Sequence, residues 1–485
     1  GECAFKVSRH QASPMGGEAP VSAARASVLG AGTGMGRTIS WAFMREPPRP
    51  APLPAAAATM RSRVLAWAMW DFGATAINAI VITFVFSIYL TGTVGDDLPG
   101  DTSPASWLGR ALALSGLVVA VLAPVTGVWV DAPVRRRRAL AVLTGLVVVL
   151  TAAMSLIRDD HRYMWPGLIL LACTAACSEL ATVPYNAMLR QLSTPENSGR
   201  ISGFGLALGY FGSVLALLVV YVGFISGTGD TRGLLGLPVD DGQNIRAAML
   251  LTAAWFALFA LPLLITVRAP TPEEPHQRVG VRGAYRALAE EIRREWRRDR
   301  HIVYFLGASA VYRDGLAGVF AFGAVLGVNV YGVSEADVLL FGMAACVVAA
   351  IGSVLGGQAD DWVGSKRVIV LSLVAMIAAG LTLMVLSGVA AFWVCGLLLC
   401  LFIGPTLSAS RTLLLRMAPE GKEGVAFGLY TTTGRAASFL APWLFSLFID
   451  IFGTDRAGMG GLCLVLLIGL LAMLAVRAPH RVVRT

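Results

Sequence analysis

The chain has 485 residues, of which 56% are hydrophobic and 14% are charged, and its mean hydropathy is +0.69. Soluble domains carry about 25% charged residues, so this composition excludes an ordinary soluble protein and indicates a membrane protein. The formal charge of +9 would raise the question of nucleic-acid binding in a soluble chain, and the distribution of that charge along the sequence argues against it.

Residues 1–59 are rich in Ala, Gly, Pro and Ser and show no sustained hydrophobic periodicity. This composition predicts a disordered tail. Met60 follows the tail and stands directly before two arginines and the first apolar run, so it is a candidate natural start, and the tail need not belong to the native protein.

From residue 64 onward the chain contains twelve apolar runs, each long enough to cross a hydrocarbon core of about 30 Å as a helix. Backbone groups in lipid must be paired within their own segment, and the runs are too long and continuous for barrel strands. An all-α membrane protein with twelve transmembrane helices is therefore predicted. The expected spans are 64–91, 107–130, 139–157, 166–188, 201–225, 245–267, 301–329, 338–358, 368–387, 391–415, 425–448 and 459–476.

The longest polar gap, 268–300, falls after the sixth run and divides the chain into two six-helix bundles, 60–267 and 301–476, with a final tail over 477–485. Apolar residues recur in the gap every three or four positions among many arginines. This pattern predicts an amphipathic helix on the inner leaflet, with a solvated charged linker as the alternative. If the amino terminus is cytoplasmic, 24 basic residues of the connections and ends lie on the cytoplasmic side and six lie outside, so both termini are predicted to be cytoplasmic.

Two short connections follow one design, which indicates an internal duplication. Each has a glycine, an aspartate four positions later and a basic residue beyond: Gly127, Asp131 and Arg135 after the second run, and Gly357, Asp361 and Lys366 after the eighth. A second pair of connections repeats at nearly the same offset: Pro195, Glu196, Gly199 and Gly203, and Pro419, Glu420, Gly424 and Gly428. An acid at a helix end beside basic residues can make breakable salt bridges, so the acidic and basic residues of the first pair are predicted to form a gate.

These connections resemble the signature loop of the major facilitator superfamily. Four stretches within the predicted helices are similar to the vacuole amino-acid effluxer-like branch of that superfamily: 67–73, 184–189, 408–411 and 427–442. The resemblance covers about residues 60–477. It implies two six-helix bundles around a central cavity and, from the fungal members, the export of amino acids from a vacuole.

Six ionisable residues lie inside the predicted helices beyond the terminal turns: Asp71, Glu179, Arg313, Asp314, Arg411 and Arg435. Each costs about 2.5–3.5 kcal/mol at a helix centre and must face a partner or a watered cavity, so such residues mark solute pathways. The predicted substrate-binding or coupling site consists of Asp71, Glu179, Arg313, Asp314, Arg435, Asn186 and Tyr430. Four further side chains could complete a pocket: Trp70, Asn78, Tyr185 and Tyr312.

Two parts of this site have alternatives. Arg313 and Asp314 are adjacent and point about 100° apart on a helix, so a structural role is an equal alternative for them. Arg411 lies near the cytoplasmic end of its helix and is predicted to close the gate.

These charges predict a secondary active transporter that moves a small polar solute, such as an amino acid, by alternating access with a proton as coupling ion. The sequence holds no phosphate-binding loop, so we expect no ATP hydrolysis, and we expect no cofactor and no metal. An integral-membrane enzyme and a non-transporting sensor are the alternatives. The expected partners are the solute and the lipid bilayer, without nucleic acid. We expect a monomer in the cell membrane, or in the vacuolar membrane if the chain is fungal.

Overall fold

The structure, a computed structural model, describes residues 54–99, 102–266 and 300–478, with eight single positions between 283 and 297. Residues 1–53 of the predicted tail, most of the predicted linker with its amphipathic helix, and residues 479–485 lie outside this part of the chain. The predicted boundary at 59 is wrong, because the first helix already begins at Pro54 and runs through four alanines. Proline suits the first helical position and alanine is the best helix former, which explains the early start.

The first half of the described chain forms what we call the N-terminal group. Its long helices are α1 (Pro54–Ile77), α3 (Pro104–Val130), α4 (Pro133–Ala153), α5 (Met164–Ala187), α7 (Ser198–Val220) and α8 (Gln243–Thr266). Short elements join them: α2 (Phe86–Tyr89), α6 (Leu189–Leu192) and an antiparallel hairpin of β1 (Thr231–Arg232) with β2 (Leu237–Pro238). Three stretches continue the long helices with π-helical turns: Asn78–Phe84, Leu90–Val94 and Tyr221–Ile225.

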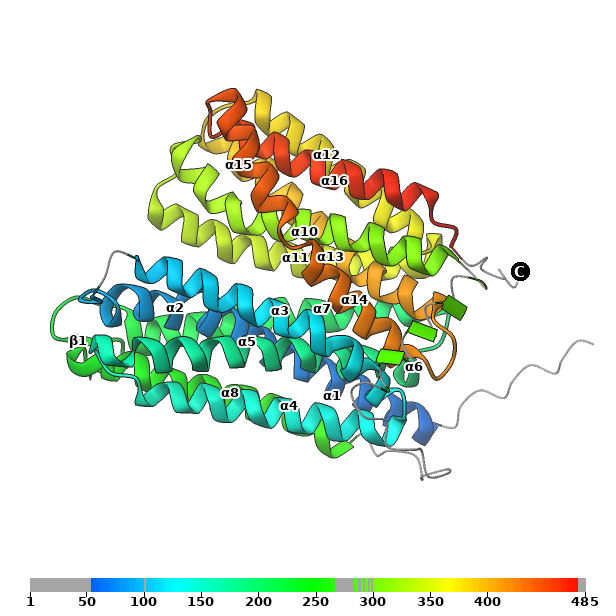
Figure 1. Cartoon of the computed structure of the whole chain (residues 1–485), viewed down its shortest axis with the longest axis horizontal. Helices are drawn as coiled ribbons and strands as arrows, with labels where there is room; N and C mark the ends of the chain where they lie inside the picture. Colours follow the sequence, from blue (N-terminus) through cyan, green and yellow to red (C-terminus); the bar gives the residue numbers. More distant parts are fainter. Residues whose placement is uncertain are drawn as a thin grey trace, which may run out of the picture. The chain divides into compact units, whose positions relative to one another are not determined.

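The second half forms the C-terminal group. Its helices are α10 (Arg300–Asn329), α11 (Glu335–Val363), α12 (Ser365–Val385), α13 (Val389–Met417), α14 (Glu423–Ala437), α15 (Leu440–Phe452) and α16 (Ala457–Ala475). Figure 1 shows the N-terminal group in blue to green and the C-terminal group in yellow-green to red.

Eleven segments of the described chain are long and apolar enough to cross a membrane. They coincide with eleven of the twelve predicted spans, and α14 and α15 together make up one of them, Glu423–Phe452. The remaining predicted span coincides with α10, which is not among the eleven and which carries Arg313 and Asp314 near its middle.

The eleventh predicted span, 425–448, is not the single continuous helix that was expected. α14 ends at Ala437 and α15 begins at Leu440. Pro442 lies in the first turn of α15 and has no N–H group, so the carbonyl of Ser438 cannot receive its usual helical hydrogen bond. The proline explains why the helix is interrupted here.

Two sets of helix contacts join the groups. α7 packs against α11 and α13, and α14 packs against α3 and α5; Figure 1 shows α14 beside α3. Glycines bring the backbones close together: Gly127 faces the carbonyl of Gly424, and Gly357 faces that of Gly199. The duplicated glycines of the sequence therefore lie at both crossings between the groups.

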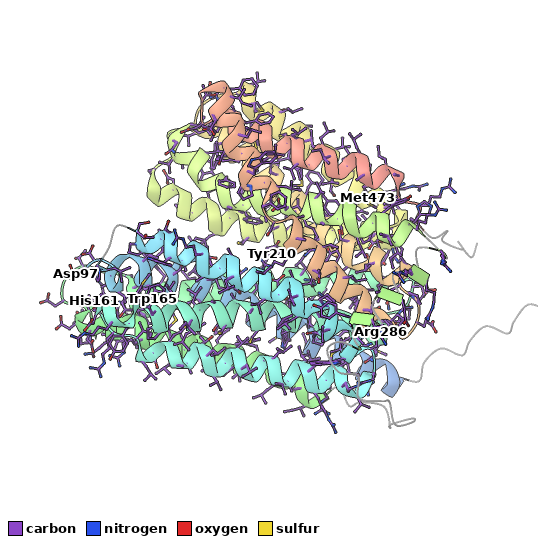
Figure 2. All side chains as sticks on the ribbon, in the orientation of Figure 1. Asp97, His161, Trp165, Tyr210, Arg286 and Met473 are labelled. Atoms are coloured by element: carbon purple, nitrogen blue, oxygen red, sulfur yellow. The ribbon has the colours of Figure 1, made fainter. Side chains whose placement is uncertain are left out.

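The two ends of the helices differ in the side chains that they present. Asp97, His161 and Trp165 lie at the end where β1 is found, and Arg286 lies at the opposite end (Figure 2). In the predicted orientation the segment around Arg286 is cytoplasmic. We therefore call its end the cytoplasmic end and the other the outer end.

Gly357→Ala should lower the thermal stability of the protein. A Cβ there would lie 2.5 Å from the carbonyl oxygen of Gly199 in the other group, so α7 and α11 would have to separate. Gly342→Ala, on the same helix, is the matched control, because nothing lies within 4 Å of its added Cβ. Alanine alone favours a helix by about 1 kcal/mol, so the control should be neutral or slightly stabilising. Thermal unfolding in detergent, followed by tryptophan fluorescence, measures both; equal effects would contradict the close crossing.

Candidate functional site

A cavity of about 410 Å³ lies beside α1, α3 and α5. Its lining includes polar side chains at several depths: Asp71, Thr75, Asn78, Ser115, Ser178, Glu179, Thr182 and Arg435. Arg435 is the single lining residue contributed by the C-terminal group among the described residues. The volume of the cavity falls within the range of about 300–1,000 Å³ that is usual for small-molecule sites.

Glu179 and Arg435 form an ion pair across the cavity. Glu179 is on α5, Arg435 is in the last turn of α14, and their carboxylate and guanidinium atoms are 2.5 Å apart. The side chains stay 27% and 39% exposed. A pair that water reaches can exchange its partners, so each group can accept a solute group of opposite charge.

Asp71 and Arg411 form a second pair between the two groups, on α1 and α13. The closest oxygen and nitrogen are 3.7 Å apart, and neither atom has a hydrogen bond to a described residue. At that distance the pair is an ion pair without a hydrogen bond. The structure thus places Arg411 beside the cavity acid Asp71, although it was predicted as a residue of the cytoplasmic gate.

Tight packing surrounds the Asp71 carboxylate. A Cβ at Gly209 of α7 would lie 3.2 Å from the carboxyl carbon. Nearby, the rings of Trp67 and Trp70 both stack on Tyr185, with centroid separations of 4.6 Å and 4.4 Å. This aromatic stack ties α1 to α5 and so holds Asp71 in a fixed place.

Arg313 and Asp314 do not line the cavity. Arg313 donates to the backbone carbonyl of Tyr430 at 2.9 Å and lies over the Tyr430 ring, 3.8 Å from its centroid. Asp314 accepts a hydrogen bond of 2.5 Å from the backbone N–H of Ala441. Both residues therefore contact the interrupted α14–α15 segment.

Of the other predicted pocket residues, some line the cavity and others do not. Trp70 and Asn78 line the cavity, whereas Tyr185, Asn186 and Tyr430 are buried away from it. The Oδ1 atom of Asn186 has no hydrogen-bond partner among the described residues. The hydroxyl groups of Tyr312 and Ser410 of α13 form a hydrogen bond, with their oxygen atoms 2.6 Å apart.

At the cytoplasmic end each group supplies an aspartate to the other group. Asp361 accepts hydrogen bonds from the backbone N–H groups of Gly199 and Arg200, at 2.8 Å and 2.9 Å, where α7 begins. Asp131 accepts one from the N–H of Val425, at 3.1 Å, where α14 begins. Unpaired N–H groups and the helix dipole make helix starts good partners for carboxylates, so both aspartates cap helices of the opposite group.

The other two predicted gate residues do not take part in this crossing. Lys366 donates to the carbonyls of Leu474 and Val476 within its own group. Arg135 makes no ion pair with any described residue, and the neighbouring Arg136 crosses to the C-terminal group instead.

The sequence interpretation missed a buried ion network at this end. Glu423 of α14 is 3.2 Å from Arg136 and 2.6 Å from Arg190, both of the N-terminal group. Arg416 of α13 lies 2.6 Å from Asp360 and donates to Ser198 of α7. Arg190 stands five residues before Pro195 and Arg416 three before Pro419, so the repeat offset does not align them and gave no signal for either.

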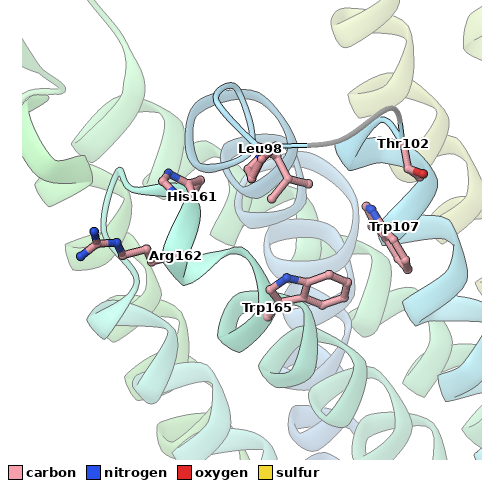
Figure 3. Close-up of a pocket in the computed structure, with 7 residues that line it drawn as sticks. Leu98, Thr102, Trp107, His161, Arg162 and Trp165 are labelled. Carbon is pink, nitrogen blue, oxygen red and sulfur yellow. The ribbon is translucent and has the colours of Figure 1, made fainter.

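A smaller hollow of about 260 Å³ lies at the outer end, between the start of α3 and the start of α5. Figure 3 shows Leu98, Trp107 and Trp165 around it. The two indoles meet edge to face with centroids 4.8 Å apart. Exposed tryptophans at this level are typical of the membrane interface.

The chain has the fold of solved transporters of the major facilitator superfamily. Similar solved structures include the E. coli fucose:proton symporter FucP (12% identity, TM-score 0.68, 87% of this chain and 100% of that one). The proton:xylose symporter XylE is also similar (15%, 0.63, 86% and 94%). A third is a bacterial homologue of the iron transporter ferroportin in an outward-facing state (14%, 0.61, 86% and 98%). At these identities the likeness shows the fold.

Sequence relatives identify the family. The family described as "Vacuole effluxer Atg22 like" matches residues 99–483, so the chain belongs to it. Relatives include the uncharacterized MFS-type transporter YxiO of Bacillus subtilis, 23% identical over 84% of this chain and 93% of that protein. Autophagy-related protein 22 of Cryptococcus neoformans is 24% identical over 64% of this chain and 60% of its own length. The predicted superfamily and branch are confirmed: the protein is a multi-pass membrane transporter of the secondary type and not an enzyme.

The buried carboxyl of Asp131, which caps α14, is sensitive to pH. Burial raises the pKa of Asp131 from 3.8 to about 6, against the opposing effects of the Val425 N–H, Lys422 and Arg136. Glu423 adds to the increase. The carboxyl of Asp131 therefore takes up a proton more readily in this closed arrangement than in water.

Acidification should stabilise the protein through Asp131. The contribution of a group with a raised pKa is fully present below its unfolded value of 3.8 and is lost as the pH rises through about 6. Thermal unfolding at about pH 5 and about pH 7.5 should therefore differ more in the parent than in Asp131→Asn, on the order of 1–2 kcal/mol. An identical pH dependence in both proteins would contradict the assignment.

Proposed function

We propose that the protein carries a small zwitterionic solute, of the chemistry of an amino acid, by alternating access of the two groups. The observation that carries this proposal is the Glu179–Arg435 pair, whose acid and base come from different groups and meet in the cavity. A guanidinium binds a carboxylate through two parallel hydrogen bonds, and a carboxylate binds an ammonium group. A zwitterion can therefore take the place of both partners at once.

The proposal includes the finer membrane topology. α10 also crosses the membrane, as the seventh span in chain order, and brings the total to twelve. Both termini are cytoplasmic. The two groups are six-helix bundles joined by the linker 268–300. The ion pairs of Glu423, Asp361 and Asp131 then lie on the cytoplasmic side and must break before the cavity opens there. In this proposal the protein acts as a monomer.

The coupling ion in this proposal is a proton, carried by Asp71. Its carboxylate lines the cavity and is the partner of Arg411 in the other group. Protonation of Asp71 removes the charge that attracts Arg411, so it weakens one of the two ion pairs that join the groups beside the cavity. The likeness in fold to the proton symporters FucP and XylE supports this choice of ion.

Loss of either member of the cavity pair should impair transport. Arg435→Gln and Glu179→Gln should each lower kcat/KM by about tenfold or more, equivalent to about 1.4 kcal/mol. Arg367→Gln, which removes an exposed guanidinium from α12, is the control and should transport like the parent. Proteoliposome uptake of radiolabelled amino acids, with sugars as a second class, measures this. Uptake of sugars alone would contradict a zwitterionic solute.

Asp71→Asn should separate exchange from accumulation. Without a titratable group at this position the protein should still exchange solute across the membrane, because the Glu179–Arg435 pair is intact. A pH gradient should no longer drive accumulation. Asp97→Asn, at the exposed outer end, is the matched control. Gradient-driven accumulation by Asp71→Asn at the parent level would exclude Asp71 as the coupling residue.

A further inference from the structure

The interruption of the eleventh span leaves backbone groups that need partners. Ala441, at the start of α15, cannot donate its N–H group within that helix, and the Asp314 carboxylate of α10 accepts it at 2.5 Å. Asp314 is only 6% exposed. An unpaired N–H in such a place costs about 1–3 kcal/mol, so Asp314 stabilises the interruption.

The neighbouring Arg313 binds the other side of the interruption. It donates to the carbonyl of Tyr430 in α14 at 2.9 Å. It also packs against Gly434, where a Cβ would lie 2.9 Å from its guanidinium nitrogen. Two adjacent residues of α10 thus contact α14 before the break and α15 after it.

The two halves of the span pack against different parts of the protein. α14 packs on α3 and α5 of the N-terminal group as well as on α10 of its own group, whereas α15 packs on α16 and α10 of its own group. Figure 1 shows α14 beside α3 and α15 beside α16. Arg435 is in the last turn of α14, immediately before the break, and its guanidinium reaches Glu179. The break therefore separates α14, which carries the cavity arginine and reaches the N-terminal group, from α15, which packs within the C-terminal group.

We propose that Asp314 is a positioning residue: it fixes the break between α14 and α15 and thereby places Arg435 opposite Glu179. Asp314 itself does not meet the solute, because it does not line the cavity. This proposal deepens the proposed function, since it concerns the position of the cavity arginine.

The test measures the charge of the cavity without any solute. Ser178, which lines the cavity beside Glu179, is changed to cysteine in the full chain in lipid nanodiscs. An anionic and a cationic methanethiosulfonate reagent then label it, and intact mass counts the labels above those of the parent, which keeps its native cysteines. Arg435 in place favours the anionic reagent.

Asp314→Leu should lower the ratio of anionic to cationic labelling rates by about fivefold, because Arg435 leaves its place near the reporter. Arg435→Gln should lower it equally, and Asp314→Leu should add nothing in the Arg435→Gln background. Asp314→Asn is the matched control: its amide oxygen still accepts from Ala441, so the ratio should stay near the parent value. Additive effects, or an unchanged ratio in Asp314→Leu, would overturn the positioning role.

Pro442→Ala provides an independent variant should Asp314→Leu fail to fold. The new N–H can bond to the carbonyl of Ser438, so the helix straightens and Arg435 moves. The same decrease in the labelling ratio is expected. A parent-like ratio, or unfolding of both variants, would show that the break serves stability alone. Because no solute is used, failure of the transport assays leaves this result valid.

Discussion

Pairing of charge inside the membrane is the constraint on which the rest of the structure depends. The N-terminal group supplies the acids, Asp71 and Glu179, and the C-terminal group supplies the arginines, Arg411 and Arg435. An unpaired charge near the middle of a bilayer costs several kcal/mol, so neither group can move away unless water, a solute or a proton replaces the lost partner. The two groups can therefore separate only when the charges at the cavity find other partners.

The cytoplasmic end repeats this dependence with helix ends in place of cavity residues. Asp361 accepts from two backbone N–H groups and lies 3.1 Å from Arg200. Asp131 accepts from one N–H group and lies 3.7 Å from Lys422. The two caps are related by duplication but are unequal, because Asp361 accepts more hydrogen bonds than Asp131. Where α14 meets α3, the ion pairs of Glu423 with Arg136 and Arg190 supplement the cap of Asp131, and α14 is the helix that carries Arg435.

The sequence was enough to predict the membrane spans and the charged residues within them. A span must be a long and mostly apolar segment, and this property can be read along the chain. It did not reveal how the charges pair, because pairing depends on which helices become neighbours. Arg313 and Asp314 illustrate the limit: their depth predicted the cavity, but their contacts are with the backbone of α14 and α15. Arg136 was missed because nothing in a run of four arginines marks the one that becomes buried against Glu423.

The interruption of the eleventh span follows from Pro442 and from the cost of leaving backbone groups unpaired in the membrane. Pro442 removes a backbone donor inside a membrane span, and a helix end in the membrane is tolerated only where protein groups bind it. Asp314 provides the acceptor for Ala441, and Arg313 binds the carbonyl of Tyr430. The two charges near the middle of α10 are therefore the groups that permit α14 to end beside the cavity. An apolar α10 would span the membrane more easily, but it would leave the end of α14, and with it Arg435, without support.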